Sequence, residues 1–186
     1  MSQLTFILGG ARSGKSRYAQ ELALQSSGGK PVLYLATGVR TDGEMSERID
    51  RHQSDRPNHW RTAEEPLEAA AVFRRETEPP VVLLDCLTFF VTNHLLKDTD
   101  WTEAEPTWDE AGAEDAVDEL IMAVQECAVP QIFIVSNEVG MGLHPDTPLG
   151  RVFRDVAGRG NQKMAAAADT VIFMVAGIPW KIKDAL

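Results

Sequence analysis

The stretch Gly9-Gly10-Ala11-Arg12-Ser13-Gly14-Lys15-Ser16 decides the fold, because it fits the pattern G-x-x-x-x-G-K-[ST]. Two glycines let the backbone curl so that successive N–H groups point at phosphate oxygens, and a following helix adds its positive N-terminal end. Lys15 is expected to reach the β- and γ-phosphates of a bound nucleotide, and the Ser16 hydroxyl to bind a bridging Mg²⁺. An apolar run at 4–8 precedes this loop and a segment of helical composition follows it. The sequence therefore predicts a nucleotide site between a strand and a helix.

Length and composition predict a single domain, residues 1–186. The 18 Lys and Arg residues against 28 Asp and Glu residues give a net charge of -10, which argues against a protein that coats nucleic acid. Cys86 and Cys127 lack metal-ligand spacing, so we expect reduced, buried thiols in a cytoplasmic protein. The longest apolar stretch, near 165–178, is interrupted by Asp169 and Thr170, so no membrane span is expected.

Apolar segments and helical segments alternate along the whole chain. Strands are predicted at 4–8, 32–36, 81–85, 131–135 and 170–175. Helices are predicted at 16–24, 45–55, from Glu64 to about Arg75, 86–96, 113–128 and 149–168. This order predicts parallel strands joined by right-handed crossovers in a three-layer α/β sandwich. Together with the phosphate-binding loop, it predicts a three-layer P-loop NTPase fold with a mostly parallel, RecA-like sheet.

Polar residues follow three of the predicted strands, where a ligand is expected in an open α/β sheet. After the strand at 131–135 they are the polar side chains and glycines of 136–142, Asn137 among them. Ala36, Thr37 and Gly38 end the second strand, and Thr37 either offers its hydroxyl to the ligand or belongs to an ordinary turn. Asp85 ends the third strand, and this position is typical of a Walker-B residue. A carboxylate there can hold Mg²⁺ directly or through a water, opposite Ser16.

The most basic part of the chain lies between Arg48 and Arg61 and contains two histidines. Composition alone favours a solvated residue over a catalytic one for His52. His59 precedes Trp60, and this neighbour favours a structural packing role for it.

Several motifs beyond the phosphate loop occur together and extend nearly from end to end. They are Gly9 to Arg17, Ala36-Thr37, Glu44-Met45 with Arg48-Ile49, Arg56-Pro57 with His59 to Thr62, Asn137 to Gly142, Phe153 to Arg159, Asn161-Gln162 and Ala165 to Asp169. In this combination the chain resembles the bifunctional adenosylcobinamide kinase/adenosylcobinamide-phosphate guanylyltransferase family of cobalamin biosynthesis. A P-loop kinase of another family would share the first motif and, at most, Asp85.

The resemblance implies two reactions and the residues that serve them. ATP or GTP would phosphorylate adenosylcobinamide, and GMP would then pass from GTP to adenosylcobinamide phosphate through a guanylylated histidine, which matches His52. Mg²⁺ is implied as the metal, with Ser16 and Asp85 as its ligands, and a homotrimer as the assembly. The implied catalytic residues are His52 and Lys15. The implied nucleotide contacts are Gly9, Gly10, Ala11, Arg12, Ser13, Gly14, Lys15, Ser16, Ala36, Thr37, Gly38, Gln53, Ser54, Asp55, Arg56, Glu64 and Asp85.

Two other functions remain open on the residues alone. A simple small-molecule kinase would need the phosphate loop and Asp85 but no nucleophilic histidine. A nucleotide-sensing switch would change conformation or partners and would carry no covalent nucleotide. The chain also departs from the family pattern at two places: some relatives have a His-His pair where this chain has Arg51-His52, and some have Glu at the position of Asp85.

Overall fold

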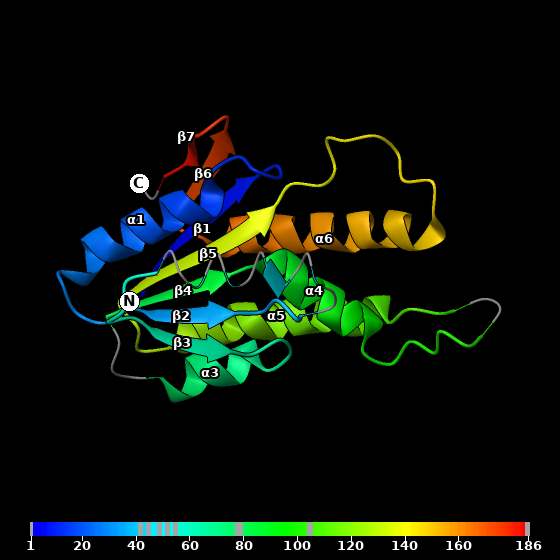
Figure 1. Cartoon of the computed structure of the whole chain (residues 1–186), viewed down its shortest axis with the longest axis horizontal. Coiled ribbons are helices and arrows are strands. Elements are labelled where there is room, and N and C mark those ends of the chain that lie inside the picture. Colours follow the sequence, from blue (N-terminus) through cyan, green and yellow to red (C-terminus); the bar gives the residue numbers. More distant parts are fainter. Residues whose placement is uncertain are drawn as a thin grey trace.

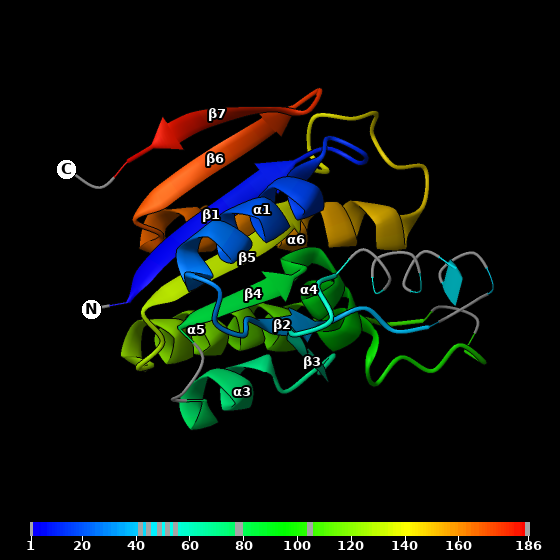
Figure 2. The same ribbon diagram turned by 60° about the vertical axis from the view of Figure 1, so that its left-hand side comes forward.

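The computed structural model describes residues 2–40, 43, 46–47, 50, 53, 56–76, 80–103 and 106–184. Within this part of the chain lies a seven-stranded sheet with the order β3-β2-β4-β5-β1-β6-β7 (Figures 1 and 2). Neighbouring strands are parallel except for β7, which pairs antiparallel with β6. The strands are β1 Gln3–Gly9, β2 Leu33–Ala36, β3 Arg61–Glu64, β4 Val81–Asp85, β5 Gln131–Asn137, β6 Thr170–Val175 and β7 Ile178–Lys183.

Helices cover both faces of this sheet, so the expected three layers are present (Figure 2). Helix α1 (Lys15–Ser27) lies on one face. The opposite face carries α4 (Leu87–Leu96), α5 (Glu110–Glu126) and α6 (Pro148–Ala167), and α3 (Ala69–Arg75) packs on α5. The mostly parallel P-loop fold predicted from the sequence is confirmed.

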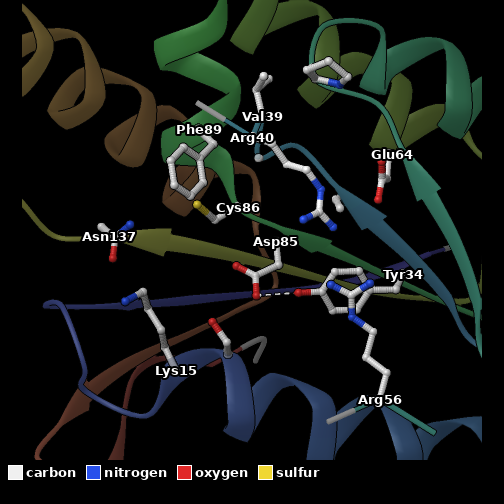
Figure 3. A pocket seen from close by; sticks show the side chains of 14 residues that line it. Lys15, Tyr34, Val39, Arg40, Arg56, Glu64, Asp85, Cys86, Phe89 and Asn137 are labelled. Atoms are coloured by element: carbon white, nitrogen blue, oxygen red, sulfur yellow. Dashed lines mark hydrogen bonds between the residues drawn. The ribbon is translucent and has the colours of Figure 1, made fainter. Parts of the chain in front are cut away.

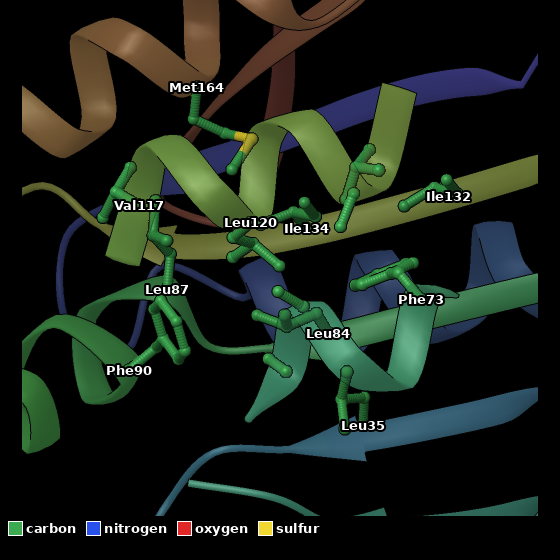
Figure 4. Close-up of a cluster of buried hydrophobic side chains, with 14 of the residues drawn as sticks. Leu35, Phe73, Leu84, Leu87, Phe90, Val117, Leu120, Ile132, Ile134 and Met164 are labelled. Atoms are coloured by element: carbon green, nitrogen blue, oxygen red, sulfur yellow. The ribbon is translucent and has the colours of Figure 1, made fainter. Parts of the chain in front are cut away.

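The buried side chains form two cores, one on each face, because alternate residues of a strand point to opposite sides. Leu35 and Leu84 belong to the larger core, beneath α3 to α6, together with Leu120 of α5 (Figure 4). Tyr34 and Leu83 belong to the smaller core, which faces α1. Asp85 lies two residues beyond Leu83, so it falls on the α1 side of the sheet, as Tyr34 does.

The five predicted strands are present, but β3 and β7 are additional. β3 has the sequence Arg-Thr-Ala-Glu and is an edge strand with mostly exposed side chains, so it carries no hydrophobic signal. The sequence of β7 does have a strand-like pattern, because the large apolar residues Ile178, Trp180 and Ile182 occupy every second position. Ala176 and Gly177 form the hairpin turn before it, both with positive φ, as a two-residue type I′ turn requires.

The helix expected from Glu64 is wrong in its first residues. Glu64 ends β3, and the Glu65 N–H continues the ladder by donating to the Ala36 carbonyl at 2.8 Å. The helix α3 begins only at Ala69. Pro66 belongs to the bend between strand and helix. This correction matters because it places Glu64 at a strand end, where ligands bind in such sheets.

Three smaller expectations have different outcomes. The helix expected at 45–55 lies largely outside the described residues. Cys86 and Cys127 are free thiols, the first buried and the second partly buried. Among the described residues no helix is both long and apolar enough to cross a membrane.

Candidate functional site: a nucleotide pocket at the strand ends

The phosphate loop connects β1 to α1 and has the backbone conformation of an anion site. Arg12 and Gly14 have φ values of 57° and 91°, and such left-handed residues turn successive N–H groups toward a common centre. Gly9 is required for space, since a Cβ there would lie 2.6 Å from Ser13 Oγ and 2.8 Å from the Met174 carbonyl oxygen. The Gly177 N–H donates to the Ser13 carbonyl at 3.0 Å, which ties the loop to the β6–β7 turn.

Lys15 is the first residue of α1 and is only 6% exposed. Its Nζ donates to the Gly10 carbonyl oxygen at 3.0 Å, so the ammonium group lies across the loop. A triphosphate bound by the loop would meet this cation together with the N-terminal end of the helix. The loop, the lysine and the helix therefore form a site for phosphate groups.

A pocket of about 410 Å³ opens beside this loop, at the carboxyl ends of the parallel strands (Figure 3). A volume of this size suits a small-molecule ligand. The residues that line the pocket are Lys15, Ser16, Tyr34, Ala36, Gly38, Val39, Arg40, Arg56, Glu64, Pro66, Asp85, Cys86, Phe89 and Asn137.

Tyr34 contacts both Asp85 and Arg56 in the pocket. The Tyr34 hydroxyl donates to Asp85 Oδ2 at 2.8 Å, and the Arg56 guanidinium lies 3.5 Å from the centroid of the Tyr34 ring (Figure 3). Burial, followed by the negative charge of Asp85, raises the pKa of Tyr34 well above its usual value. The phenol therefore stays protonated and remains a hydrogen-bond donor to the carboxylate.

The structure brings together most of the predicted site residues that it describes. Lys15, Ser16, Ala36, Gly38, Arg56, Glu64 and Asp85 line the pocket, and Gly9 to Gly14 form the loop beside it. Gln53 does not line the pocket, but its Nε2 donates to Glu64 Oε1 at 2.9 Å. Three predicted residues, His52, Ser54 and Asp55, lie outside the described residues.

The structure decides between the two alternatives for the Thr37 hydroxyl, and His59 lacks the packing role expected for it. The Thr37 side chain is fully buried, and its hydroxyl donates to the Cys86 carbonyl at 2.7 Å and accepts from the Cys86 N–H at 2.9 Å. That hydroxyl joins β2 to the end of β4 and is not offered to a ligand. His59 is exposed, and the packing role expected for it belongs to Trp60, which is buried in the α1-side core.

The pocket also contains residues that the sequence reading did not assign to it. They are Tyr34, Val39, Arg40, Pro66, Cys86 and Phe89. Asn137 also lines the pocket, where it was expected as a polar residue at the end of the fourth predicted strand. Tyr34 had a weak signal, a phenol inside an otherwise apolar strand. Cys86 is buried, and burial together with the charge of Asp85 raises its pKa to about 11, so its thiol stays neutral.

The residues present fit a magnesium ion that is shared with a nucleotide. Ser16 and Asp85 line the same pocket from α1 and β4. Of the two carboxylate oxygens of Asp85, only Oδ2 has a hydrogen bond within the described residues, the one from Tyr34. Those residues contain no group of three His, Cys, Asp or Glu side chains that could hold a metal by themselves. One hydroxyl and one carboxylate, completed by phosphate oxygens and water, match the ligands that Mg²⁺ prefers.

Comparison with known proteins identifies the family. The sequence profile of the family described as cobinamide kinase / cobinamide phosphate guanyltransferase matches residues 5–182. The chain belongs to this family. It is 44% identical over 185 residues to the bifunctional adenosylcobalamin biosynthesis protein CobU of Escherichia coli, covering 97% of this chain and 99% of that one. The CobU protein of Salmonella typhimurium is 45% identical over 186 residues, with coverage of 97% and 99%. The CobP protein of Pseudomonas aeruginosa is 44% identical over 181 residues, with coverage of 95% and 95%.

Solved structures of lower identity share the fold. The flagellar accessory protein FlaH of Methanocaldococcus jannaschii has a TM-score of 0.52 at 16% identity, and the match covers 98% of this chain and 79% of that one. A KaiC-like protein of Pyrococcus horikoshii has a TM-score of 0.51 at 11% identity, with coverage of 92% and 70%. At these identities the likeness concerns the fold alone. It confirms the RecA-like P-loop arrangement expected from the sequence.

Proposed function

We propose that this protein phosphorylates adenosylcobinamide with ATP or GTP and then transfers GMP from GTP to adenosylcobinamide phosphate. The observation that carries the proposal is the match to the cobinamide kinase / cobinamide phosphate guanyltransferase family over residues 5–182. The pocket supports it, because a phosphate loop, a buried lysine and a carboxylate lie together at the strand ends. Both reactions would begin with a nucleoside triphosphate held in this pocket.

In the kinase reaction the aminopropanol hydroxyl of adenosylcobinamide would attack the γ-phosphorus. The new O–P bond forms as the bond from the γ-phosphorus to the β-phosphate oxygen breaks, the nucleoside diphosphate leaves, and the hydroxyl proton passes to solvent. Lys15 and the loop N–H groups would stabilise the charge on the phosphates, and bound Mg²⁺ would neutralise part of it. This step depends on positioning and charge and needs no nucleophilic side chain.

In the transfer reaction we propose His52 as the covalent carrier. A neutral imidazole nitrogen attacks the α-phosphorus of GTP, an N–P bond forms, and pyrophosphate leaves. The phosphate oxygen of adenosylcobinamide phosphate then attacks the same phosphorus, which breaks the N–P bond and gives adenosylcobinamide-GDP. Arg56 lines the pocket and would stabilise the charge that develops on the phosphates.

The test is incubation with GTP labelled at the α-phosphorus, followed by denaturation and peptide mapping. An acid-labile label on the peptide that contains His52 is the expected result. A chain that phosphorylates adenosylcobinamide but retains no label would instead be a simple kinase. A label on His59 or Lys15 would contradict the assignment of the carrier, and a lysine adduct would indicate a different nucleotidyl-transfer chemistry.

We further propose that the protein is a cytoplasmic homotrimer. The edge strand β7 supports contact between copies, since Ile178, Trp180 and Ile182 are 68%, 64% and 52% exposed on the last strand of the sheet. Large exposed apolar side chains that alternate along one strand favour a protein interface. Light scattering of the purified protein should give three times the chain mass. A Trp180→Lys variant should shift the mass toward the monomer, whereas an unchanged mass would remove β7 from the interface.

A further inference from the structure

Tyr34 is a buried phenol whose polar end reaches the pocket. Its side chain is only 2% exposed, and its ring belongs to the core between the sheet and α1. The hydroxyl donates to Asp85 Oδ2 at 2.8 Å (Figure 3). A residue that only filled the core could be Phe or Leu, because an apolar side chain needs no hydrogen-bond partner at the strand end.

The strand register explains why Tyr34 reaches this carboxylate. In the parallel pair of β2 and β4, Ala36 is opposite Asp85, and Tyr34 is two residues before Ala36 on the same face. The phenol extends along the sheet from Tyr34 toward the end of β4. The Arg56 guanidinium lies 3.5 Å from the centroid of the ring and limits its movement from that side.

One oxygen of Asp85 is therefore held by a donor that cannot itself move far. A carboxylate that is bound at one oxygen loses its freedom to rotate, so its other oxygen keeps a constant direction. Groups that hydrogen-bond to metal ligands act in this way, and their loss typically costs about 10–100-fold in metal affinity or activity.

We propose that Tyr34 is a positioning residue of the nucleotide site: its hydroxyl fixes Asp85 so that the second carboxylate oxygen faces the magnesium ion of the bound nucleotide. This inference rests on the proposed role of Asp85 as a magnesium ligand. Tyr34 itself does not contact the substrate in this proposal and acts through Asp85.

The experiment compares Tyr34→Phe with Asp85→Asn and with the unchanged protein. Tyr34→Phe removes the hydroxyl and keeps the ring on which Arg56 stacks. Binding of Mn²⁺ in the presence of a non-hydrolysable GTP analogue is measured by electron paramagnetic resonance, and binding of the analogue alone is measured by calorimetry in chelator. For Tyr34→Phe we expect Mn²⁺ affinity to fall about 10-fold with metal-free nucleotide affinity unchanged. Kinase activity should return at high Mg²⁺ concentration, which a damaged fold would not allow.

Tyr18→Phe is the matched control. Tyr18 is the other tyrosine of the chain, and its hydroxyl has no hydrogen bond among the described residues, so its loss should not change Mn²⁺ affinity. If Asp85→Asn weakens Mn²⁺ binding and Tyr34→Phe does not, the positioning role is overturned and the metal role of Asp85 stands. If Asp85→Asn leaves Mn²⁺ binding unchanged, both roles are overturned. Loss of metal-free nucleotide affinity in Tyr34→Phe would show a general structural role and would also overturn the inference.

Discussion

The two halves of the pocket are built differently. The inner half, Lys15, Ser16 and Asp85, lies on the first turn of α1 and the end of β4, where the backbone is fixed by helix and sheet. The outer half comprises Val39, Arg40, Arg56, Glu64 and Pro66, which lie on the edge strand β3 or on the segments between strands before and after it.

Exposure of the side chains follows the same division. Lys15 is 6% exposed, whereas Val39 is 43% exposed, and Arg40 forms a solvent-exposed ion pair with Asp50 at 2.7 Å. Exposed ion pairs contribute little to stability, so the outer side chains can change partners at small cost. The inner half thus suits the fixed geometry of phosphate chemistry, and the outer half suits the recognition of different ligands. Four substitutions test this difference.

Lys15→Ala should have the largest effect, because it removes the buried cation of the inner half. We expect kinase and guanylyl-transfer rates to fall by at least about 10³-fold, since charge-assisted contacts to phosphate are strong in a site with little water. Both assays are run at saturating GTP. Lys30→Ala is the control, because Lys30 is exposed and precedes β2 at the opposite end of the strands. Full guanylyl transfer by Lys15→Ala would show that the two reactions do not share the inner half.

His52→Asn should separate the two reactions. Removing the nucleophile of a two-step displacement should lower guanylyl transfer by orders of magnitude, while phosphorylation needs no imidazole and should continue. His59→Asn is the control, since His59 is exposed and lies outside the pocket lining. Equal loss of both activities in His52→Asn would mean that this residue is needed for both reactions and is not a carrier for guanylyl transfer alone.

The same division explains how much could be predicted from the sequence. The inner half follows from short-range patterns, since a glycine-rich loop must join a strand to a helix and an acid must end a neighbouring strand. The outer half depends on the alignment of distant segments. Arg56 reaches the pocket by stacking on Tyr34 from another part of the chain, and no local spacing indicates that contact. β3 was missed for a related reason, because a polar edge strand pairs through its backbone and has no apolar pattern.

Gly9→Ala tests whether the inner half depends on its backbone. The added Cβ would meet Ser13 Oγ at 2.6 Å and the Met174 carbonyl oxygen at 2.8 Å, and the carbonyl cannot move without disturbing β6. We expect a loss of about 1–3 kcal/mol in the free energy of unfolding, measured by urea denaturation, together with weaker GTP binding. Gly10→Ala is the stability control, because a Cβ at Gly10 meets no atom within 4 Å. Equal stability of the two variants would mean that the loop adjusts freely.

Arg56→Lys should have the smallest effect and tests the outer half. The planar guanidinium lies 3.5 Å from the centroid of the Tyr34 ring, and its Nη1 donates to Thr62 Oγ1 at 3.2 Å. A lysine keeps the charge but loses the planar stacking and the fixed fork of donors. We expect GTP affinity to fall by about 5–10-fold, in line with the ~1 kcal/mol typical of a partly exposed cation–π contact. The affinity is measured by calorimetry with a non-hydrolysable analogue.

The control for this substitution is Arg61→Lys, because Arg61 forms an exposed ion pair with Glu76 at 3.2 Å and does not line the pocket. It should leave GTP affinity unchanged. A loss in Arg56→Lys as large as that in Lys15→Ala would place Arg56 among the fixed groups of the inner half, since an adaptable outer side chain should tolerate exchange for another cation. No loss at all would mean that nucleotide binding does not depend on the planar guanidinium of Arg56.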